Sequence, residues 1–471
     1  MESIVKNKLA QIIHSFKTKK IMVIGDLMLD QYTWGEVDRI SPEAPIPVLR
    51  VKREDFRLGG AANVVYNLKV LECDVYPVGV TGNGVSGQRL MGLFKDMKIP
   101  VEGIVNTDSF KTIVKKRVLT DEQQLVRIDY ESNDYYEGQF ENQLKEKINQ
   151  ILPQMEGVVI SDYVKGVLNQ SLLSYVIKSA KSQKIPIVCD PGNGVDYTCY
   201  KGVTTIKPNR PEAEKISGIK LDTEESILKA AAIIQEKCKT DFLSISLDRN
   251  GILYYQNRNH YQFITTEAKT VYDVTGAGDT VISVIIALLS NRVSPELAIQ
   301  MANVAAGIEI SYMGVVAIPW SLILKVLNQD GISRKLISLE ALKEELELKK
   351  TAVIFTNGYF DQLSAGHLRF LLEVGKIKGK LIVAINSDQS ILSQKGSLPL
   401  LNEKTRSRLL ASLENVHRVI IFDDENASEL IEHIKPHIVV KGEQFKDVAI
   451  PEQNAIQAVG AKIQYVHHFE L

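Results

Sequence analysis

The sequence predicts an α/β protein of two domains, the first built on a mostly parallel sheet and the second a smaller α/β unit. Short apolar runs typical of buried strands alternate with amphipathic helical segments up to Pro319, and a second, smaller alternation begins near residue 351. The chain has 471 residues, more than one hydrophobic core usually supports. Together these observations favour a doubly wound sheet followed by a smaller α/β unit.

The elements of the first domain follow one another in a regular order. A helical pattern at 4–16 precedes a first strand at 20–25, which ends in Gly25-Asp26. Further strand-like runs lie at 75–80, 157–160, 186–189, 204–206 and 242–245, and helical patterns lie at 170–183 and 224–238. Segments 45–52 and 110–130 alternate in polarity and are rich in β-branched residues, so we expect antiparallel additions there that form a small lid.

The second domain begins after a charged connector. Between 338 and 350 leucines recur at helical spacing among charged residues, and a new strand opens at 352–355. A helix follows, then another strand at 381–385. We therefore assign residues 1–330 to the first domain, 331–350 to a helical linker and 351–471 to the second domain.

Composition narrows the class of protein. Lys plus Arg number 56 and Asp plus Glu 57, without long blocks of one sign, so neither nucleic acid nor an anionic membrane is the expected partner. No signal-like apolar segment opens the chain, and its apolar runs are shorter than the roughly 18 residues that span a bilayer. We expect a soluble cytoplasmic protein. Free thiols are expected because no metal-type spacing or neighbouring histidine pair occurs around Cys73, Cys189, Cys199 and Cys238.

A glycine-rich turn stands before the apolar run at 281–289. Gly276 and Gly278 leave the backbone N–H groups open to an anion, and the positive end of the following helix points to the same place. Asp279 is then placed to take a proton from a hydroxyl that attacks the γ-phosphate of ATP. The alternative is a turn that only joins a strand to a helix.

Three further features converge on phosphoryl transfer. Gly60 belongs to a glycine pair before a helix that carries Asn63, and Asp30 lies just past the carboxyl end of a strand, where α/β proteins bind ligands. Asn209 and Glu212, three apart after another strand, are suited to organising magnesium and phosphate oxygens through water. Helix capping is the alternative interpretation for each of them. Their joint occurrence in this order favours phosphoryl transfer.

These residues resemble the ribokinase-type (PfkB) sugar kinases. That family carries an N-terminal Gly-Asp, a Gly-Gly-x-x-x-Asn segment, an Asn-x-x-Glu segment and a C-terminal Gly-Ala-Gly-Asp. Longer stretches are similar to the group that joins a heptose 7-phosphate kinase to a heptose 1-phosphate adenylyltransferase of lipopolysaccharide-core synthesis, at 39–45, 123–129, 161–166 and 272–280. The resemblance covers essentially the whole chain. It implies a ribokinase-like doubly wound sheet with a small β lid, followed by a Rossmann-like nucleotidyltransferase domain.

The resemblance also implies residue roles for a kinase that uses ATP and Mg²⁺. Its substrate would be D-glycero-D-manno-heptose 7-phosphate, and the product the 1,7-bisphosphate. Asp279 becomes the base, and the anion hole consists of the backbone of Gly276, Ala277 and Gly278. The ATP side is assigned to Asn209, Arg210, Pro211, Glu212 and Thr275. The sugar is assigned to Asp30, Gly60 and Asn63, and its 7-phosphate to Lys115, Arg117 and Arg127, although such cations are often only solvated. A homodimer through the kinase domain, around 39–52, is implied as well.

The chain departs from these relatives at several positions. After Asp190-Pro191 they commonly have a lysine, and this chain has Gly192, which puts sugar or nucleotide contacts at that corner in question. The opening 355–361 resembles the cytidylyltransferase-like nucleotidyltransferases, whose His-x-Gly-His motif begins here with Ser364 and continues to Gly366 and His367. A hydroxyl cannot carry the charge of an imidazolium, and losing one transition-state donor typically costs on the order of 100- to 1000-fold in rate.

Two other phosphate-handling features of the second domain differ from that family. Segment 395–400 lacks the family's arginine, and the family's Ser/Thr-rich phosphate segment has no counterpart before Leu471. We therefore expect weak or no adenylyl transfer, with the domain kept for assembly, regulation or stability. The alternatives are a fully bifunctional enzyme that tolerates Ser364, a nucleotide-sensing or dimer-forming module that controls the kinase, and a kinase for a different sugar.

Overall fold

The computed structural model comprises two compact units, residues 1–325 and 326–471. The structure describes residues 3–120, 123–131, 138–265, 276–312, 315–328, 332, 335–347 and 352–467.

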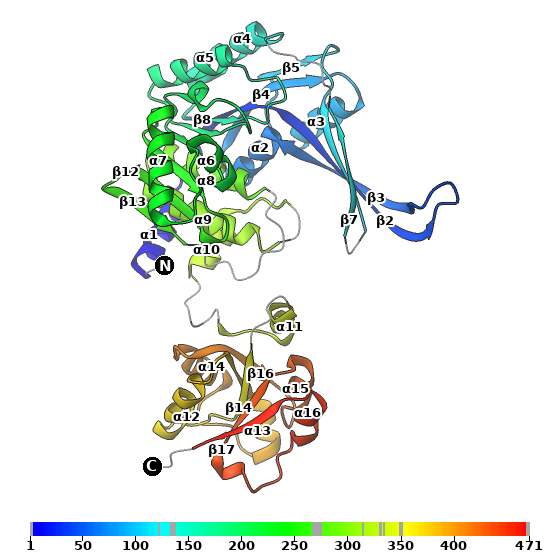
Figure 1. Ribbon diagram of the computed structural model, residues 1–471, viewed down its shortest axis with the longest axis vertical. Helices are drawn as coiled ribbons and strands as arrows, with labels where there is room; N and C mark the ends of the chain where they lie inside the picture. The colour runs from blue at the N-terminus through cyan, green and yellow to red at the C-terminus, as the bar shows by residue number, and fades with distance from the viewer. Residues whose placement is uncertain are drawn as a thin grey trace. The chain divides into compact units, whose positions relative to one another are not determined.

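The first unit is built on one large sheet, as the alternation of strands and helices predicts (Figure 1). Among the described residues its nine strands follow the order β13-β12-β11-β10-β9-β8-β1-β4-β5. The pairs from β11 to β5 are parallel, whereas β12 and β13 run antiparallel at one edge. The strands are β1 Lys20–Gly25, β4 Asp74–Gly82, β5 Ile104–Thr107, β8 Gly157–Ser161, β9 Ile187–Asp190, β10 Thr205–Ile206, β11 Phe242–Ser246, β12 Ile252–Asn257 and β13 His260–Ile264.

Helices pack against this sheet, and one of them is buried along nearly its whole length. They are α1 Ser3–His14, α2 Ala61–Val70, α3 Val85–Asp96, α4 Glu141–Ile151, α5 Gln170–Ser182, α6 Arg210–Ser217, α7 Glu224–Cys238, α8 Ala277–Ser290, α9 Pro295–Glu309 and α10 Trp320–Asn328. Helix α8 is apolar on all sides because it lies between α2, α9 and the strands β8 and β9. Its first turn, which carries Asp279, is therefore held at a fixed place beside the carboxyl ends of the central strands.

A second sheet forms the lid. It has the order β3-β2-β6-β7, with β2 Leu27–Ile40, β3 Pro47–Gly60, β6 Ile113–Leu119 and β7 Gln124–Tyr130. The ends of β2 and β3 extend away from the central sheet as a blue arm in Figure 1. The predicted lid is present, but two expectations for it were wrong. Its first strand was missed, so Asp30 lies inside β2 and not in a loop past β1. The pairing is not antiparallel throughout, because β6 runs parallel to β2. Residues 27–30 are buried on both faces, so this strand shows no alternation of polarity.

The second unit is a smaller parallel sheet flanked by helices. Its order is β16-β15-β14-β17-β18, with β14 Val353–Gly358, β15 Lys380–Asn386, β16 Val416–Phe422, β17 Ile438–Gly442 and β18 Lys462–Val466. The helices are α11 Leu339–Glu347, α12 Ala365–Gly375, α13 Asp388–Lys395, α14 Glu403–Ser412, α15 Ser428–Ile434 and α16 Gln453–Ala458. Central strands that read as continuous apolar runs are typical of parallel sheets covered on both faces.

The connector helix α11 packs against the second unit. Leu342 is buried in that unit's core, and the Glu345 carboxylate accepts from the Arg418 guanidinium at 2.7 Å and contacts His417 Nε2 at 3.2 Å. Burial alone would raise the pKa of Glu345, but the hydrogen bonds from His417 and Arg418 hold it well below its usual range. A buried ion cluster therefore fixes α11 to β16.

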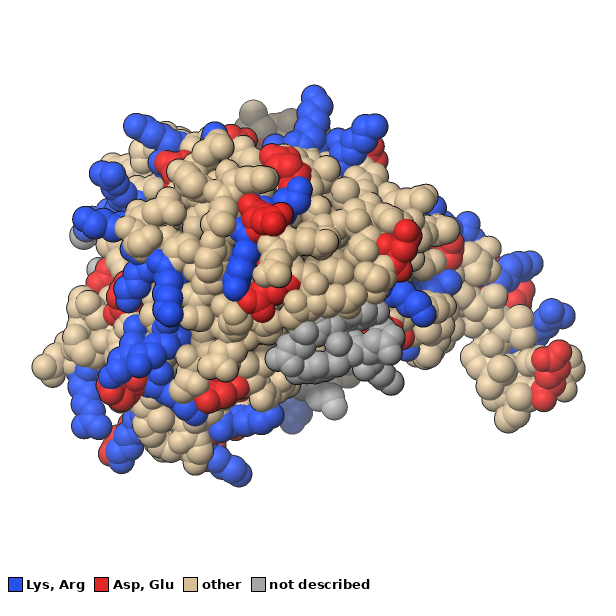
Figure 2. Space-filling model, turned by 90° about the horizontal axis from the view of Figure 1, so that it is seen from above, with Lys and Arg blue, Asp and Glu red and all other residues tan. Residues whose placement is uncertain are grey.

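The surface and the thiols agree with the composition. On the face shown in Figure 2, basic and acidic side chains are interspersed. In the part of the chain that the structure describes, no helix combines the length and the hydropathy that crossing a membrane requires. All four cysteines are free, as predicted.

Candidate active site

The glycine turn begins the buried helix α8. Gly276 is its N-cap, with a φ of 94°. A Cβ at this position would lie 2.7 Å from Glu309 Oε1, so both the conformation and the space require glycine. The backbone N–H groups of Ala277 and Gly278 belong to the first turn, where a helix has no internal acceptors for them. Thr275, assigned to the ATP side, lies outside the described residues.

Asp279 lies in this first turn, and its side chain is held by two donors. Asn63 Nδ2 donates to Oδ2 at 2.7 Å, and the Tyr163 hydroxyl donates to Oδ1 at 3.2 Å. Burial and the charge of Asp190 raise the pKa of Asp279 to about 7, although Asn63, Lys207 and Tyr163 act in the opposite direction. A carboxylate with a pKa near neutrality, aimed at a cavity, is suited to accept a proton.

Helix α2 brings Asn63 to Asp279. Its N-cap, Gly60, has a φ of 56°, and a Cβ there would be 2.7 Å from the carbonyl oxygen of Asp26. One turn further, Asn67 accepts from the Thr280 hydroxyl at 3.0 Å and donates to the carbonyl oxygen of Asn63 at 3.0 Å. Asn63 therefore lies within α2 and does not cap it. The predicted glycine pair and amide thus meet the predicted base.

The loop after β8 supplies Tyr163, to which the sequence interpretation gave no role. The buried Asp26 carboxylate accepts from the backbone N–H groups of Tyr163 at 3.0 Å, Lys165 at 3.1 Å and Val167 at 3.4 Å. Burial and the nearby Asp162 raise the pKa of Asp26 to about 6. Tyr163 follows the carboxyl end of a central strand, and that position was the available sequence signal.

A cavity of about 290 Å³ opens beside Asp279. Its lining comes from the carboxyl ends of β8, β9 and β10 and from the start of α8, and comprises Asp162, Tyr163, Asp190, Pro191, Asn193, Lys207, Asn209, Glu212, Gly276, Gly278 and Asp279. Asp190 and Lys207, which were missed from the sequence, form an ion pair with an Nζ–Oδ1 distance of 3.1 Å, in which the lysine is buried and the acid half-buried. The cavity thus joins the predicted base, the glycine turn and part of the predicted ATP side.

The 209–212 segment also caps a helix. The Asn209 side chain accepts from the Glu212 backbone N–H at 2.9 Å, and Glu212 Oε2 accepts from the Asn209 backbone at 2.9 Å. This capping box starts α6, with Pro211 in its first turn. Arg210 points elsewhere, to Asp248 Oδ2 at 2.9 Å. Capping was the alternative interpretation, and it holds structurally while both side chains still line the cavity.

Asp30 and the three cations assigned to the sugar phosphate lie at three different positions. Arg117 Nη1 lies 3.0 Å from Asp30 Oδ1, so two of them pair with each other. Arg127 is half exposed and forms its ion pair with Asp129, at an Nε–Oδ1 distance of 3.0 Å. Lys115 lies over the Tyr163 ring, with Nζ 5.3 Å from its centroid. Because the Tyr163 hydroxyl donates to Asp279, these contacts connect Lys115, among the three predicted cations, to the predicted base.

The second unit has a separate cavity of about 650 Å³. Ser364 and His367, from the altered histidine motif, both line it, and Gly366, between them in the sequence, is buried. Ser364 is the N-cap of α12 and its hydroxyl lies 2.9 Å from His367 Nδ1. The residue that replaces the first histidine thus contacts the second one.

A lysine in the same cavity is matched by an acid. Lys441 Nζ donates to Glu452 Oε2 at 3.0 Å and to Asn357 Oδ1 at 2.8 Å, and Asn357 Nδ2 donates to Glu452 Oε1 at 2.9 Å. Burial lowers the pKa of Lys441. Burial alone would raise the pKa of Glu452, but the attraction of the Lys441 charge lowers it. The positive charge of Lys441, which would attract a nucleotide phosphate, is therefore already offset by Glu452.

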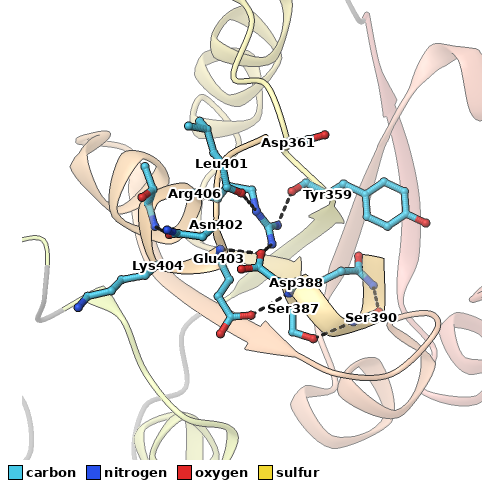
Figure 3. Close-up of polar contacts among 12 residues, drawn as sticks. Tyr359, Asp361, Ser387, Asp388, Ser390, Leu401, Asn402, Glu403, Lys404 and Arg406 are labelled. Atoms are coloured by element: carbon cyan, nitrogen blue, oxygen red, sulfur yellow. Dashed lines mark hydrogen bonds and ion pairs between the residues drawn. The ribbon is translucent and has the colours of Figure 1, made fainter. Parts of the chain in front are cut away.

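A buried arginine holds the loop beside this cavity (Figure 3). The Arg406 guanidinium donates to the carbonyl oxygens of Leu401 at 2.8 Å and Tyr359 at 2.7 Å, and to Asp388 Oδ1 at 2.7 Å. Asp388 and Glu403 exchange backbone-to-carboxylate hydrogen bonds, at 2.8 and 2.7 Å. Arg406 is thus buried and makes these hydrogen bonds within the second unit. They fix the backbone of Tyr359 at the cavity wall.

Comparisons with known proteins agree with this division. Residues 18–321 match the model of the pfkB family carbohydrate kinases, and residues 355–468 match the cytidylyltransferase-like family. The chain is 40% identical over 437 residues to a bifunctional protein HldE of Helicobacter hepaticus, covering 91% of this chain and 90% of that protein. It is 34% identical over 467 residues to a bifunctional protein HldE of Syntrophotalea carbinolica, covering 98% and 95%.

Solved structures are similar to the first unit. Ribokinase of Arabidopsis thaliana, in complex with ribose and ATP, has a TM-score of 0.55 at 18% identity and covers 67% of this chain and 100% of that one. Phosphofructokinase-2 of Escherichia coli, in complex with fructose-6-phosphate, has a TM-score of 0.55 at 20% identity, covering 66% and 100%. At these identities the likeness shows the ribokinase-like fold alone.

Proposed function

Since the chain belongs to the pfkB family of carbohydrate kinases and, over nearly its whole length, to the bifunctional HldE proteins, we propose that its first unit is a heptose 7-phosphate kinase. It transfers the γ-phosphate of ATP to the anomeric hydroxyl of D-glycero-D-manno-heptose 7-phosphate. The product is the 1,7-bisphosphate, a precursor for the lipopolysaccharide core. We place this reaction in the cytoplasm, where ATP is available.

One observation supports the proposal most directly. The buried, hydrogen-bonded carboxylate of Asp279 lies in the first turn of α8, where the backbone N–H groups have no acceptors within the helix. Asp279 takes the proton of the anomeric hydroxyl as its oxygen bonds to the γ-phosphorus, and the bond from that phosphorus to the β–γ bridging oxygen breaks to release ADP. The N–H groups at the start of α8 stabilise the charge on the transferred group. Asn63 and Tyr163 orient the carboxylate.

The cavity suits a magnesium nucleotide. Its lining oxygens come from Asp162, Asp190, Asn209 and Glu212, and hard oxygen donors are what Mg²⁺ prefers. Asn209 and Glu212 would hold the ion on the ATP side, and it would offset phosphate charge there.

The sugar phosphate is assigned to the lid side of Asp279. Lys115 and the Asp30–Arg117 pair stand in neighbouring positions of β6 and β2. A phosphate that contacts Lys115 and draws Arg117 from Asp30 would gain paired positive charge, and Asp30 would then be released toward a sugar hydroxyl. This sequence of contacts favours a phosphorylated sugar over an unphosphorylated one.

A panel of sugars tests the substrate. The full-length protein is incubated with ATP, Mg²⁺ and each of heptose 7-phosphate, fructose 6-phosphate, ribose and unphosphorylated heptose, and ADP release is measured. We expect the highest kcat/KM with heptose 7-phosphate. Preference for an unphosphorylated sugar would overturn the substrate assignment, and no sugar-dependent ADP with any of them would overturn the kinase assignment.

The raised pKa of Asp279 sets the pH dependence. A base must be unprotonated, so kcat/KM should rise with pH through about 7 and level off above it. At pH 6 the rate constant is expected to be about a tenth of the plateau value. The measurement is the initial rate at low substrate from pH 5.5 to 8.5. A flat profile over this range would contradict the role of Asp279.

For the second unit we propose weak or no adenylyl transfer, and a role in assembly, regulation or stability. Two observations support this: Ser364 replaces a charged histidine and contacts His367, and Glu452 offsets Lys441. A working heptose 1-phosphate adenylyltransferase is the second candidate, favoured by the family match and by the open cavity of about 650 Å³.

We also propose a homodimer through the lid. Apolar side chains exposed on its strands or at the β2–β3 connection include Val37, Ile40, Ile46, Val51, Val126, Ile128 and Tyr130. Such a surface favours burial against a second copy. Light scattering should give about twice the 52.6 kDa of one chain, whereas a monomer mass at micromolar concentration would argue against the dimer.

A further inference from the structure

Lys207 lies at the end of β10, where the backbone turns toward α6. Its backbone N–H donates to the carbonyl oxygen of Cys189 at 2.9 Å, which fixes the residue beside Asp190. The side chain is only 6% exposed and lines the cavity next to Asp279. Lys207 is not among the residues predicted to form the base, the anion hole or the ATP side.

The ammonium group lies against the first turn of α8. A Cβ built on Gly278 would be 3.1 Å from Lys207 Nζ and 3.8 Å from Asp190 Oδ2. Glycine at 278 therefore leaves a space between the ammonium and the open N–H groups of the helix start. Two positive features, a lysine charge and a helix N-terminus, face the same small volume.

The other charged side chains that line the cavity are acidic, so an anion needs the Lys207 charge to bind there. Asp162, Asp190, Glu212 and Asp279 also line the cavity, and Lys207 is the basic side chain among its described lining residues. A nucleotide phosphate entering here would be repelled by the acids unless cations offset them. After Asp190-Pro191 the chain continues with Gly192 and Asn193, so that corner supplies no cation of its own.

We propose that Lys207 contacts the phosphate that is transferred from ATP and stabilises its developing charge at the start of α8. The proposal rests on the kinase function proposed above. Asp190 holds the ammonium in the absence of nucleotide, at 3.1 Å, and keeps the lysine extended toward the cavity. The same charge favours the ionised form of Asp279, which gives Lys207 a second effect on the reaction.

The competing explanation is a purely structural ion pair, in which Lys207 only neutralises Asp190. Removing one partner of a buried pair leaves an unpaired charge and is destabilising, so a single variant cannot separate the two explanations. The double variant Lys207→Met/Asp190→Asn leaves no unpaired charge. It should fold whichever explanation holds.

The test compares kinase kinetics of the full-length variants with thermal unfolding as the check on folding. Lys207→Met is expected to lower kcat for sugar-dependent ADP release by about 100-fold or more, with a smaller change in KM for ATP. Lys207→Arg should retain part of kcat because it keeps the charge. In the residual activity of Lys207→Met, the rise of kcat/KM with pH should move to higher pH. Lys229→Met, which removes an exposed lysine of α7, serves as the control and should match the parent protein.

The double variant decides between the explanations. If Lys207 meets the phosphate, Lys207→Met/Asp190→Asn stays as slow as Lys207→Met. Restoration of activity in the double variant, or a Lys207→Met rate within threefold of the parent protein, would overturn the proposal. Absence of sugar-dependent ADP release from the parent protein would instead refute the kinase function itself.

Discussion

Replacing Asp279 with asparagine should lower kcat for sugar-dependent ADP release by about 10²- to 10⁴-fold. The amide keeps the shape of the side chain but cannot accept the proton of the anomeric hydroxyl. Asn63 and Tyr163 now donate to the two carboxylate oxygens. In the variant, Asn63 can still donate to the remaining oxygen, and the Tyr163 hydroxyl can accept from the new amide NH2. The rates are measured with saturating ATP and heptose 7-phosphate.

The same variant should be more stable than the parent protein at alkaline pH. The folded-state pKa of Asp279, about 7, lies above its ordinary value of 3.8, so the native state holds a proton that the unfolded state has already lost. Stability is therefore lost as pH rises from about 4 to about 7, and the asparagine avoids this loss. The Tm advantage of Asp279→Asn should be larger at pH 8 than at pH 5. Asp222→Asn, at an exposed acid, is the control and should change neither rate nor Tm.

An intact or only slightly reduced ADP rate in Asp279→Asn would refute the assignment of the base. A variant that is both inactive and less stable at pH 8 would instead indicate that the loss of activity comes from misfolding. The combination of lost activity and raised stability is the specific signature of a buried, functional carboxylate.

The second large effect concerns the second unit. Pyrophosphate release from heptose 1-phosphate and ATP is expected to be on the order of 100- to 1000-fold slower than an efficient adenylyl transfer, because Ser364 cannot donate as an imidazolium does. Ser364→His should raise this rate, and Glu452→Gln should strengthen nucleotide binding because it leaves Lys441 to meet the phosphates. Gln362→His places a histidine at the same cavity outside the motif position and serves as the control.

Ordinary enzymatic rates of pyrophosphate release from the parent protein would show that the second unit is a working adenylyltransferase and that Ser364 is tolerated. No gain from Ser364→His alone, but a gain when it is combined with Glu452→Gln, would place the main defect at Lys441. Each variant is assayed in the Asp279→Asn background, so that nucleotide consumed by the kinase does not contribute.

The sequence predicts those parts of the kinase centre that consist of residues close together in the chain. Asp279 follows its glycines directly, and Asn63 follows Gly60 by three residues, so their positions on helix starts can be read from the chain. That α2 and α8 lie together is not visible in the sequence, and the Asn63–Asp279 hydrogen bond shows that these two candidates meet. The parallel sheet follows from the alternation of strands and helices in the same way.

Contacts that depend on strand register could not be predicted. Arg117 meets Asp30 because β6 pairs with β2 in parallel register, and Arg127 lies opposite Arg117 on β7 with Asp129 as its own acid. Three cations that look equivalent in the sequence are thus different in space. Lys207 and Tyr163 were missed for a related reason, since only the fold shows that the loops after β8, β9 and β10 surround one cavity.

The most direct test of the central claim is a ³¹P NMR spectrum of the full-length protein after incubation with ATP, Mg²⁺ and heptose 7-phosphate. We predict a new anomeric phosphate signal beside the retained 7-phosphate, formed in equal amount with ADP and absent with Asp279→Asn. An unchanged sugar spectrum, or phosphorylation at a carbon other than the anomeric one, would contradict the account.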